Sequence, residues 1–107
     1  SVSQFLAEQN EIYLGDIELL LESQLERLSQ CEKQVSYWLA TQAEAVNISQ
    51  PPANIELSKS ELWQAIQSLG RRGLVERVEI GDRSHFEIDR IFKQYIQSKA
   101  NPQREKQ

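Results

Sequence analysis

The chain has few of the residues that build disulfides, metal centres and nucleophilic active sites. Its 107 residues include one cysteine, Cys31, one histidine, His85, and no methionine. This count excludes a disulfide framework and an ordinary zinc site made of histidine and cysteine ligands. A Cys31–His85 catalytic pair is arithmetically possible, but nothing in the sequence around either residue supports it. Because even position 1 is not methionine, we expect a processed chain or a piece of a longer one.

Glycine, proline and long apolar runs are also scarce. Four glycines and three prolines are too few for a disordered or fibrous chain. Apolar runs such as Leu19–Leu21 are far too short to span a membrane, and no basic and apolar leader opens the chain. With 39% apolar and 26% charged residues, the sequence predicts one globular domain, and we expect it in the cytoplasm.

Charge is unevenly distributed and is negative overall. Residues 1–32 carry seven acids and one base, net −6, and residues 33–107 carry eleven bases and nine acids, net +2, which gives −4 for the chain. A net acidic domain is not typical of proteins that bind the phosphate backbone, so we expect no nucleic acid partner. There is no glycine-rich Walker A loop, and no carboxylate pair lies near a nucleophile, so the sequence indicates no enzyme.

Apolar residues at steps of three and four predict most of the chain to be helical. Two short segments, Ser29–Glu32 and Ser58–Glu61, have the form of a capping box at a helix start. Either Gly70 or Gly73 is expected to end the helix that begins after Ser58. The predicted helices cover residues 2–8, 16–28, 30–42 and 59–70, followed by a last one from Ile88 to about residue 98.

Between the second and third of the longer helices, the sequence predicts a short strand and then a loop. Val46–Ile48 is β-branched and alternating, whereas Pro51 and Pro52 prevent a helix from continuing. We therefore expect residues 49–57 to be mostly loop, with at most one helical turn.

A hairpin is predicted after Gly73, with strands at 74–80 and 83–88. Glycine first in the two-residue loop Gly81–Asp82 suits a type II′ turn. Alternation within each strand predicts one dry and one wet face. The dry face is expected to carry Val78, Ile80, Phe86 and Ile88, and the wet face Arg77, Glu79, His85 and Glu87. The four acids and two arginines of the hairpin give it a net charge of −2.

This order of elements predicts an α+β domain, mostly α, of the winged helix-turn-helix class. It would have an N-terminal helical extension and a two-stranded wing. We predict a division into residues 1–28 as extension and linker, 29–98 as the winged-helix domain, and 99–107 as a polar tail.

Several segments resemble one family in order and spacing. Residues 28–40, LSQCEKQVSYWLA, are similar to the "LSxxEKxxxYWLA" opening of the winged-helix domain of bacterial STAND NTPases. Residues 62–76, LWQAIQSLGRRGLVE, resemble the same family's "LLEALESLRRRSLIE", and Gly15–Ile17 with Gln24–Ser29 resemble its "GDI … QxERLS" lead-in. The resemblance covers roughly residues 3–97. A departure is the stretch 47–54, which is shorter than in the family and broken by prolines.

The resemblance implies a regulatory relay and not a catalyst. In such proteins this domain lies between an NB-ARC or NACHT-type nucleotide-binding core and WD or other repeats. The implied partners are therefore the NTPase core and the repeat domain of the same parent chain. The parent would bind ATP or ADP, whereas this chain would hold no cofactor and no metal. The family's Met-His-Asp triplet, whose histidine senses the ADP β-phosphate, matches residues 88–90 here, so the nucleotide-sensor position falls at Asp89.

The candidate contact residues lie on or near the helix predicted at 59–70. Trp63, Arg71 and Arg72 are the predicted contacts with a partner or a neighbouring domain. For Trp63 the alternative is a residue packed beneath the N-terminal helix, and for the arginines it is a solvated pair that completes the helix dipole. If the chain were instead a small DNA-binding regulator, the contacts would be Lys59, Gln64, Gln67, Arg71, Arg72 and Arg83. A stand-alone protein-interaction module is the third possibility, and the oligomeric state is open.

Overall fold

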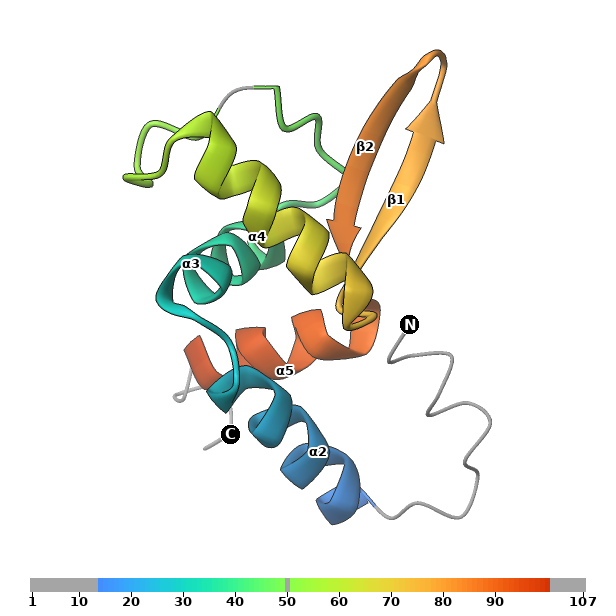
Figure 1. Ribbon diagram of the computed structural model, residues 1–107. Coiled ribbons are helices and arrows are strands. Elements are labelled where there is room, and N and C mark those ends of the chain that lie inside the picture. The colour runs from blue at the N-terminus through green and yellow to red at the C-terminus, as the bar shows by residue number, and fades with distance from the viewer. Residues whose placement is uncertain (1–13, 50, 101–107) are drawn as a thin grey trace.

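A computed structural model describes residues 14–49 and 51–100, which form a small α+β domain of four helices and a two-stranded antiparallel sheet (Figure 1). The helix predicted at 2–8 and most of the predicted tail lie outside the described residues. The elements are α2 (Leu14–Glu26), α3 (Gln30–Ala40), α4 (Lys59–Arg71), β1 (Val75–Ile80), β2 (Arg83–Ile88) and α5 (Arg90–Ala100).

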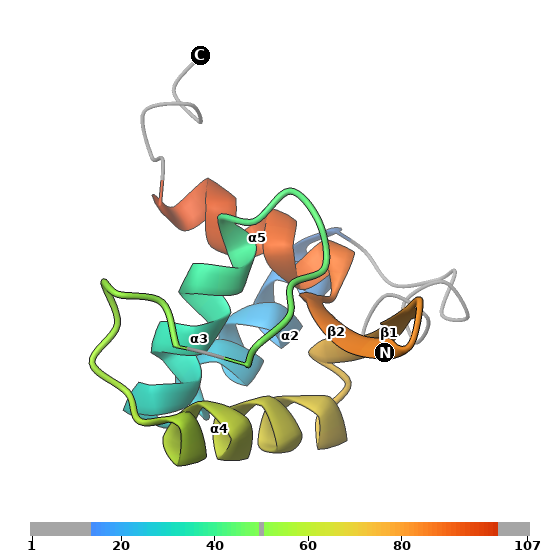
Figure 2. The ribbon, with the colours of Figure 1, turned by 90° about the horizontal axis from the view of Figure 1, so that it is seen from above.

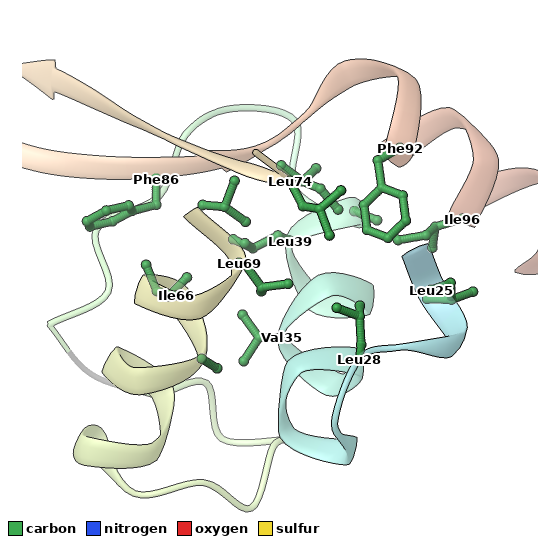
Figure 3. Close-up of a cluster of buried hydrophobic side chains, with 14 of the residues drawn as sticks. Leu25, Leu28, Val35, Leu39, Ile66, Leu69, Leu74, Phe86, Phe92 and Ile96 are labelled. Atoms are coloured by element: carbon green, nitrogen blue, oxygen red, sulfur yellow. The ribbon is translucent and has the colours of Figure 1, made fainter. Parts of the chain in front are cut away.

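The core lies where α3, α4 and α5 meet, with α3 between the other two (Figure 2). Most of the apolar positions that predicted the helices are buried in this core or packed against it. Figure 3 shows Val35 and Leu39 of α3 facing Ile66 and Leu69 of α4, with Phe92 of α5 above them. Residues on and just after α2 join the same cluster through Leu21, Leu25 and Leu28.

Both predicted capping boxes are confirmed. At each site the serine hydroxyl accepts a hydrogen bond from the glutamate amide at 3.1 Å, and the glutamate carboxylate accepts one from the serine amide. Of the two glycines considered as the end of α4, Gly73 has the role. Its φ of +74° is left-handed, and the amide of Leu74 then reaches back to the carbonyl of Leu69 at 3.0 Å.

Residues 41–58 connect α3 to α4 and, leaving Gln50 aside, contain no helix. The predicted strand is reduced to one bridge, in which Val46 exchanges two 2.8 Å hydrogen bonds with Phe86 of β2. The prolines are followed by a single turn, closed by the Ile55 amide on the Pro52 carbonyl at 3.2 Å. The expectation of a loop with at most one turn is therefore confirmed for the described part of this range.

The hairpin forms where it was predicted, but the assignment of its faces is wrong. The two-residue loop pairs Ile80 with Arg83 and Val78 with His85. Directly paired residues place their side chains on the same face of a hairpin. Val78 and Ile80 therefore lie on one face of the hairpin, and Phe86 lies on the other. Ile80 is accordingly 51% exposed. Gly81 has a φ of +65° and Asp82 does not have a positive φ, as a type II′ turn requires.

The last helix is positioned by its own cap and by contacts with α3. It begins at Arg90 and not at Ile88, because Ile88 is the last residue of β2. On its inner side the ammonium of Lys93 donates to the carbonyl of Gln42 at 2.7 Å, and the amide of Gln97 donates to the carbonyl of Ala40 at 3.0 Å. These two bonds satisfy the last carbonyl of α3 and a carbonyl two residues beyond it.

Candidate interaction surface

Trp63 lies on the exposed side of α4 and touches the hairpin. Its side chain is in edge-to-face contact with Phe86, with ring centroids 5.8 Å apart and planes at 82°. The residue is nevertheless 48% exposed. The helix predicted at 2–8 lies outside the described residues, so packing of Trp63 beneath it stays a prediction. Half-exposed tryptophans are frequent anchors in protein interfaces, so the position suits the predicted contact role.

The two arginines after Leu69 point in different directions. Arg72 caps α4, and its guanidinium donates to the carbonyl of Arg27 at 3.3 Å. Arg71 is exposed and lines the grooves on both sides of α4. In the DNA-binding alternative both arginines would act together with Lys59. Lys59 is at the other end of α4, about 18 Å away at 1.5 Å per residue, so the structure does not bring the three together.

The residues of the DNA-binding alternative are exposed but do not form one basic face. Gln64 lines the groove between α3 and α4, whereas Gln67 lines the groove between α4 and the hairpin. Arg83 lies near the hairpin tip on the face that points away from Phe86. Exposed Glu61 interrupts the row on α4. A strand of phosphates would meet cations and carboxylates alternately, which is unfavourable for backbone binding.

Glu32 is the one charged residue of the groove between α3 and α4 that is itself buried. Burial raises the pKa of its carboxyl, but the amide and hydroxyl of Ser29, the hydroxyl of Ser68 and the guanidinium of Arg72 outweigh that effect, so the pKa lies below its usual value. Arg72 therefore acts on α3, which the sequence did not indicate. The groove has a volume of about 520 Å³ and also contains Glu61 and Arg71.

Asp89, the position matched to the family's nucleotide sensor, is buried at the start of α5. Its carboxylate accepts hydrogen bonds from the amides of Ile91 and Phe92, both at 3.2 Å, and its own amide donates to the Leu74 carbonyl at 2.8 Å. This is the geometry of a helix N-cap. A carboxylate that already accepts from two amides fits a helix start better than it fits a phosphate.

The described residues offer no group of three or more metal-ligating side chains. Cys31 is half-buried in the first turn of α3, and His85 is half-buried on the outer face of the hairpin. No helix within 14–49 and 51–100 is long and apolar enough to cross a bilayer.

Sequence reasoning missed two residues that complete the surface beside Trp63. Arg77 was placed on the wet face and Phe86 with Val78 and Ile80, but the register pairs Arg77 directly with Phe86. The length of the loop was the available signal. A two-residue loop at Gly81–Asp82 pairs Ile80 with Arg83, so every pair in the hairpin has residue numbers that add to 163. Applied to Phe86, that sum identifies Arg77.

Comparison with known proteins gives one similar sequence. Over 80 residues the chain is 36% identical to an uncharacterized WD repeat-containing protein of Nostoc sp.. The match covers 71% of this chain and 6% of that protein, so the chain spans only a small fraction of its relative's length. No family model matches the chain, and no solved structure matches it.

Proposed function

We propose that this chain is a winged-helix module without catalytic activity of its own, which works inside a larger STAND-type signalling NTPase. The observation that carries the proposal is the match to the Nostoc protein. A segment similar to 71% of this chain occurs there within a much longer polypeptide that is named for WD repeats. The family resemblance of residues 28–40 and 62–76 supports the same parent architecture.

The arrangement of elements supports the winged-helix assignment. Helix α3, the Val46 bridge, helix α4 and the β1–β2 hairpin follow each other in the order that such a domain requires. The bridge stands where a third strand joins the wing. The middle helix of the usual three is replaced by the turn at Pro52. The core closes without it, because α2 and α5 supply buried residues from either end of the chain.

In this proposal the module relays nucleotide state through packing. Its partners are the NTPase core and the repeat domain of the parent, and large exposed apolar side chains are the expected contacts. Leu19 on α2, Trp63 on α4 and Ile80 on the hairpin lie on three different elements. Two packing arrangements that differ by a few kcal/mol can be biased by the nucleotide, because a ligand shifts an equilibrium by its differential affinity.

The parent is expected to bind ATP or ADP through its own core, without a phosphate contact donated by Asp89. That carboxylate has the wrong charge for a phosphate and already caps α5. The isolated chain should therefore show no heat of binding with either nucleotide in calorimetry. Binding at millimolar concentration or tighter would contradict the relay and would point to Arg71 as part of a phosphate site.

The test uses the parent protein. The full open reading frame should encode a Walker A motif before this segment and repeats after it. In the purified parent, hydrogen exchange at the amides of α4 and the hairpin should differ between the ADP and ATP states. The matched control is the isolated 107-residue chain, whose exchange should be the same with either nucleotide. Equal protection of α4 and the hairpin in both states of the parent would contradict the proposal.

A DNA-binding regulator is the alternative, favoured by the exposure of Lys59, Gln64 and Gln67 on α4. It predicts binding to duplex DNA that survives physiological salt. Sub-micromolar affinity lost in Arg71→Glu would replace the relay with this function.

A further inference from the structure

A groove with an unusual lining runs between α4 and the inner face of the hairpin. Its volume is about 280 Å³. From α4 come Gln67, Gly70 and Arg71, and from the hairpin come Arg77 and Phe86. Trp63 stands one helical turn before Gln67 on the same stripe of α4, in contact with Phe86. Figures 1 and 2 both show the base of the hairpin beside the C-terminal half of α4.

The charge of this groove is opposite to that of the chain. Its lining contains two arginines and no carboxylate, although the chain has a net charge of −4. Four further pockets among the described residues each include at least one aspartate or glutamate. The groove therefore brings two arginines together with Phe86, one member of the aromatic pair.

Both guanidiniums are available to an incoming anion. Within the described residues, Arg71 is exposed and has no ion pair. Arg77 pairs only with Glu79, at 3.0 Å, and both side chains are more than half exposed. An ion pair in that position contributes little and exchanges readily for a better one. A carboxylate held between two guanidiniums makes charge-assisted hydrogen bonds, which are stronger than neutral ones.

We propose that this groove binds a short acidic segment of a protein partner. Carboxylates of the segment pair with Arg71 and Arg77, and one aliphatic or aromatic side chain packs on Trp63 and Phe86. The proposal rests on the protein-interaction role proposed above and gives that role a partner chemistry. It does not depend on the parent being an NTPase.

The surroundings favour a peptide over a nucleic acid. Glu79 lies on the same face of the hairpin as Arg77, and Glu76 and Glu87 lie on the other face, beyond the edge of the groove. A polyphosphate backbone must place several charges in a row and would meet these acids. A peptide needs only one or two carboxylates between Arg71 and Arg77 and can present apolar or neutral groups elsewhere.

The test measures binding of a synthetic peptide to the 107-residue chain. The probe is a short capped peptide in which leucines alternate with aspartates, and its match has asparagine at each aspartate. Calorimetry gives the affinity, and the indole N–H resonance of Trp63 reports the site. We expect the aspartate peptide to bind and to shift that resonance, and the asparagine peptide to bind at least about tenfold more weakly.

Variants on the groove sharpen the test. Arg71→Ala and Arg77→Ala should each weaken binding by about tenfold. Glu79→Gln should strengthen it, because Arg77 then loses its competing partner. Arg83→Ala is the matched control, since it removes the same charge from the opposite face of the hairpin and should change nothing.

Two substitutions at Gly70 test the groove by the size of the side chain, without a change of charge. A Cβ at Gly70 would lie 3.8 Å from the Val75 carbonyl, an ordinary contact, and alanine is the better helix former. Gly70→Ala should therefore bind normally, whereas Gly70→Leu should fill the groove and abolish binding in a folded protein.

Three results would overturn the proposal. They are no binding of the aspartate peptide, equal binding of both peptides, or loss of binding in Arg83→Ala as large as in Arg77→Ala. Duplex DNA is tested as the alternative ligand. Tight binding of DNA that depends on both Arg71 and Arg83 would assign the surface to a nucleic acid. None of these outcomes bears on nucleotide-dependent exchange in the parent, so the two proposals fail separately.

Discussion

The two capping boxes are alike locally and differ in what surrounds them. Ser29 with Glu32 and Ser58 with Glu61 make the same pair of hydrogen bonds, with lengths that agree within 0.1 Å. Glu32 is 6% exposed and has Ser68 and Arg72 as neighbours from the end of α4. Glu61 is exposed, and within the part of the chain that the structure describes it bonds only within its own box.

The difference shows how one sequence motif serves two purposes. At α4 the box only starts a helix, so its contribution is that of a surface cap. At α3 the same glutamate is also buried near Ser68 and Arg72 at the end of α4, so that a local cap becomes part of a tertiary contact. The motif alone does not distinguish the two, because the distinction depends on which residues arrive from about 40 positions further along the chain.

The largest contrast is expected at the residue that follows each capping glutamate. Leu62 is 1% exposed, whereas Lys33 is half-buried on the first turn of α3. Leu62→Asp places a charge in the core and should abolish the folded state. Lys33→Asp is the matched control and should change the free energy of unfolding by less than about 0.5 kcal/mol. Thermal unfolding followed by circular dichroism checks both, and a cooperative transition of Leu62→Asp near the wild-type temperature would contradict the fold.

The next contrast separates the glutamates themselves. Glu32→Ala removes the cap, the carboxylate beside Ser68 and Arg72, and a buried side chain. It should lower the free energy of unfolding by about 2 kcal/mol. Glu61→Ala removes an exposed cap and should cost about 0.5 kcal/mol. Urea denaturation measures both values. Equal costs would mean that the contacts of Glu32 with α4 add nothing to its cap.

The smallest effect concerns pH. Because the folded-state pKa of Glu32 is lower than its ordinary 4.5, folding disfavours protonation of this group. Its contribution is fully present above about pH 4.5 and is lost as the pH falls toward the folded-state pKa. Glu32→Gln should therefore flatten the decline of stability with acid. Glu61→Gln leaves the Glu32 contribution in place, and a decline equally flattened in both variants would contradict the assignment.

Most of the fold could be predicted because its signals are local. The periodicity of Leu62, Ala65, Ile66 and Leu69, together with the box at Ser58, fixed α4 to within one residue. Pairing between strands is a different matter, since alternation places Val78 on one of two faces without saying which face Phe86 shares. The number of residues in the loop decides which residues are paired. Here the two-residue loop pairs Arg77 with Phe86 and so places Arg77 in the groove beside α4.

The candidate surface was predicted only in part for the same reason. Trp63 was singled out from its position off the apolar stripe, and its exposure agrees with that interpretation. Its contact with Phe86 joins residues 23 positions apart on different elements, which no periodicity reveals. The cap made by Asp89 was also missed. The family resemblance led to an interpretation of Asp89 as a nucleotide-sensor position, and its place at the start of α5 was not considered.

The hydrogen bonds from α5 to α3 have a consequence for synthesis on the ribosome. Lys93 and Gln97 reach back 51 and 57 residues to their acceptors. At ordinary translation speeds, α3 is made roughly 3 to 10 seconds before its last carbonyls can be satisfied. During that interval the nascent chain also lacks Phe92 and Ile96, so the part of α3 that packs against α5 stays uncovered. The module therefore completes its fold with its final helix, and rare codons in that stretch would lengthen the time during which chaperones can bind it.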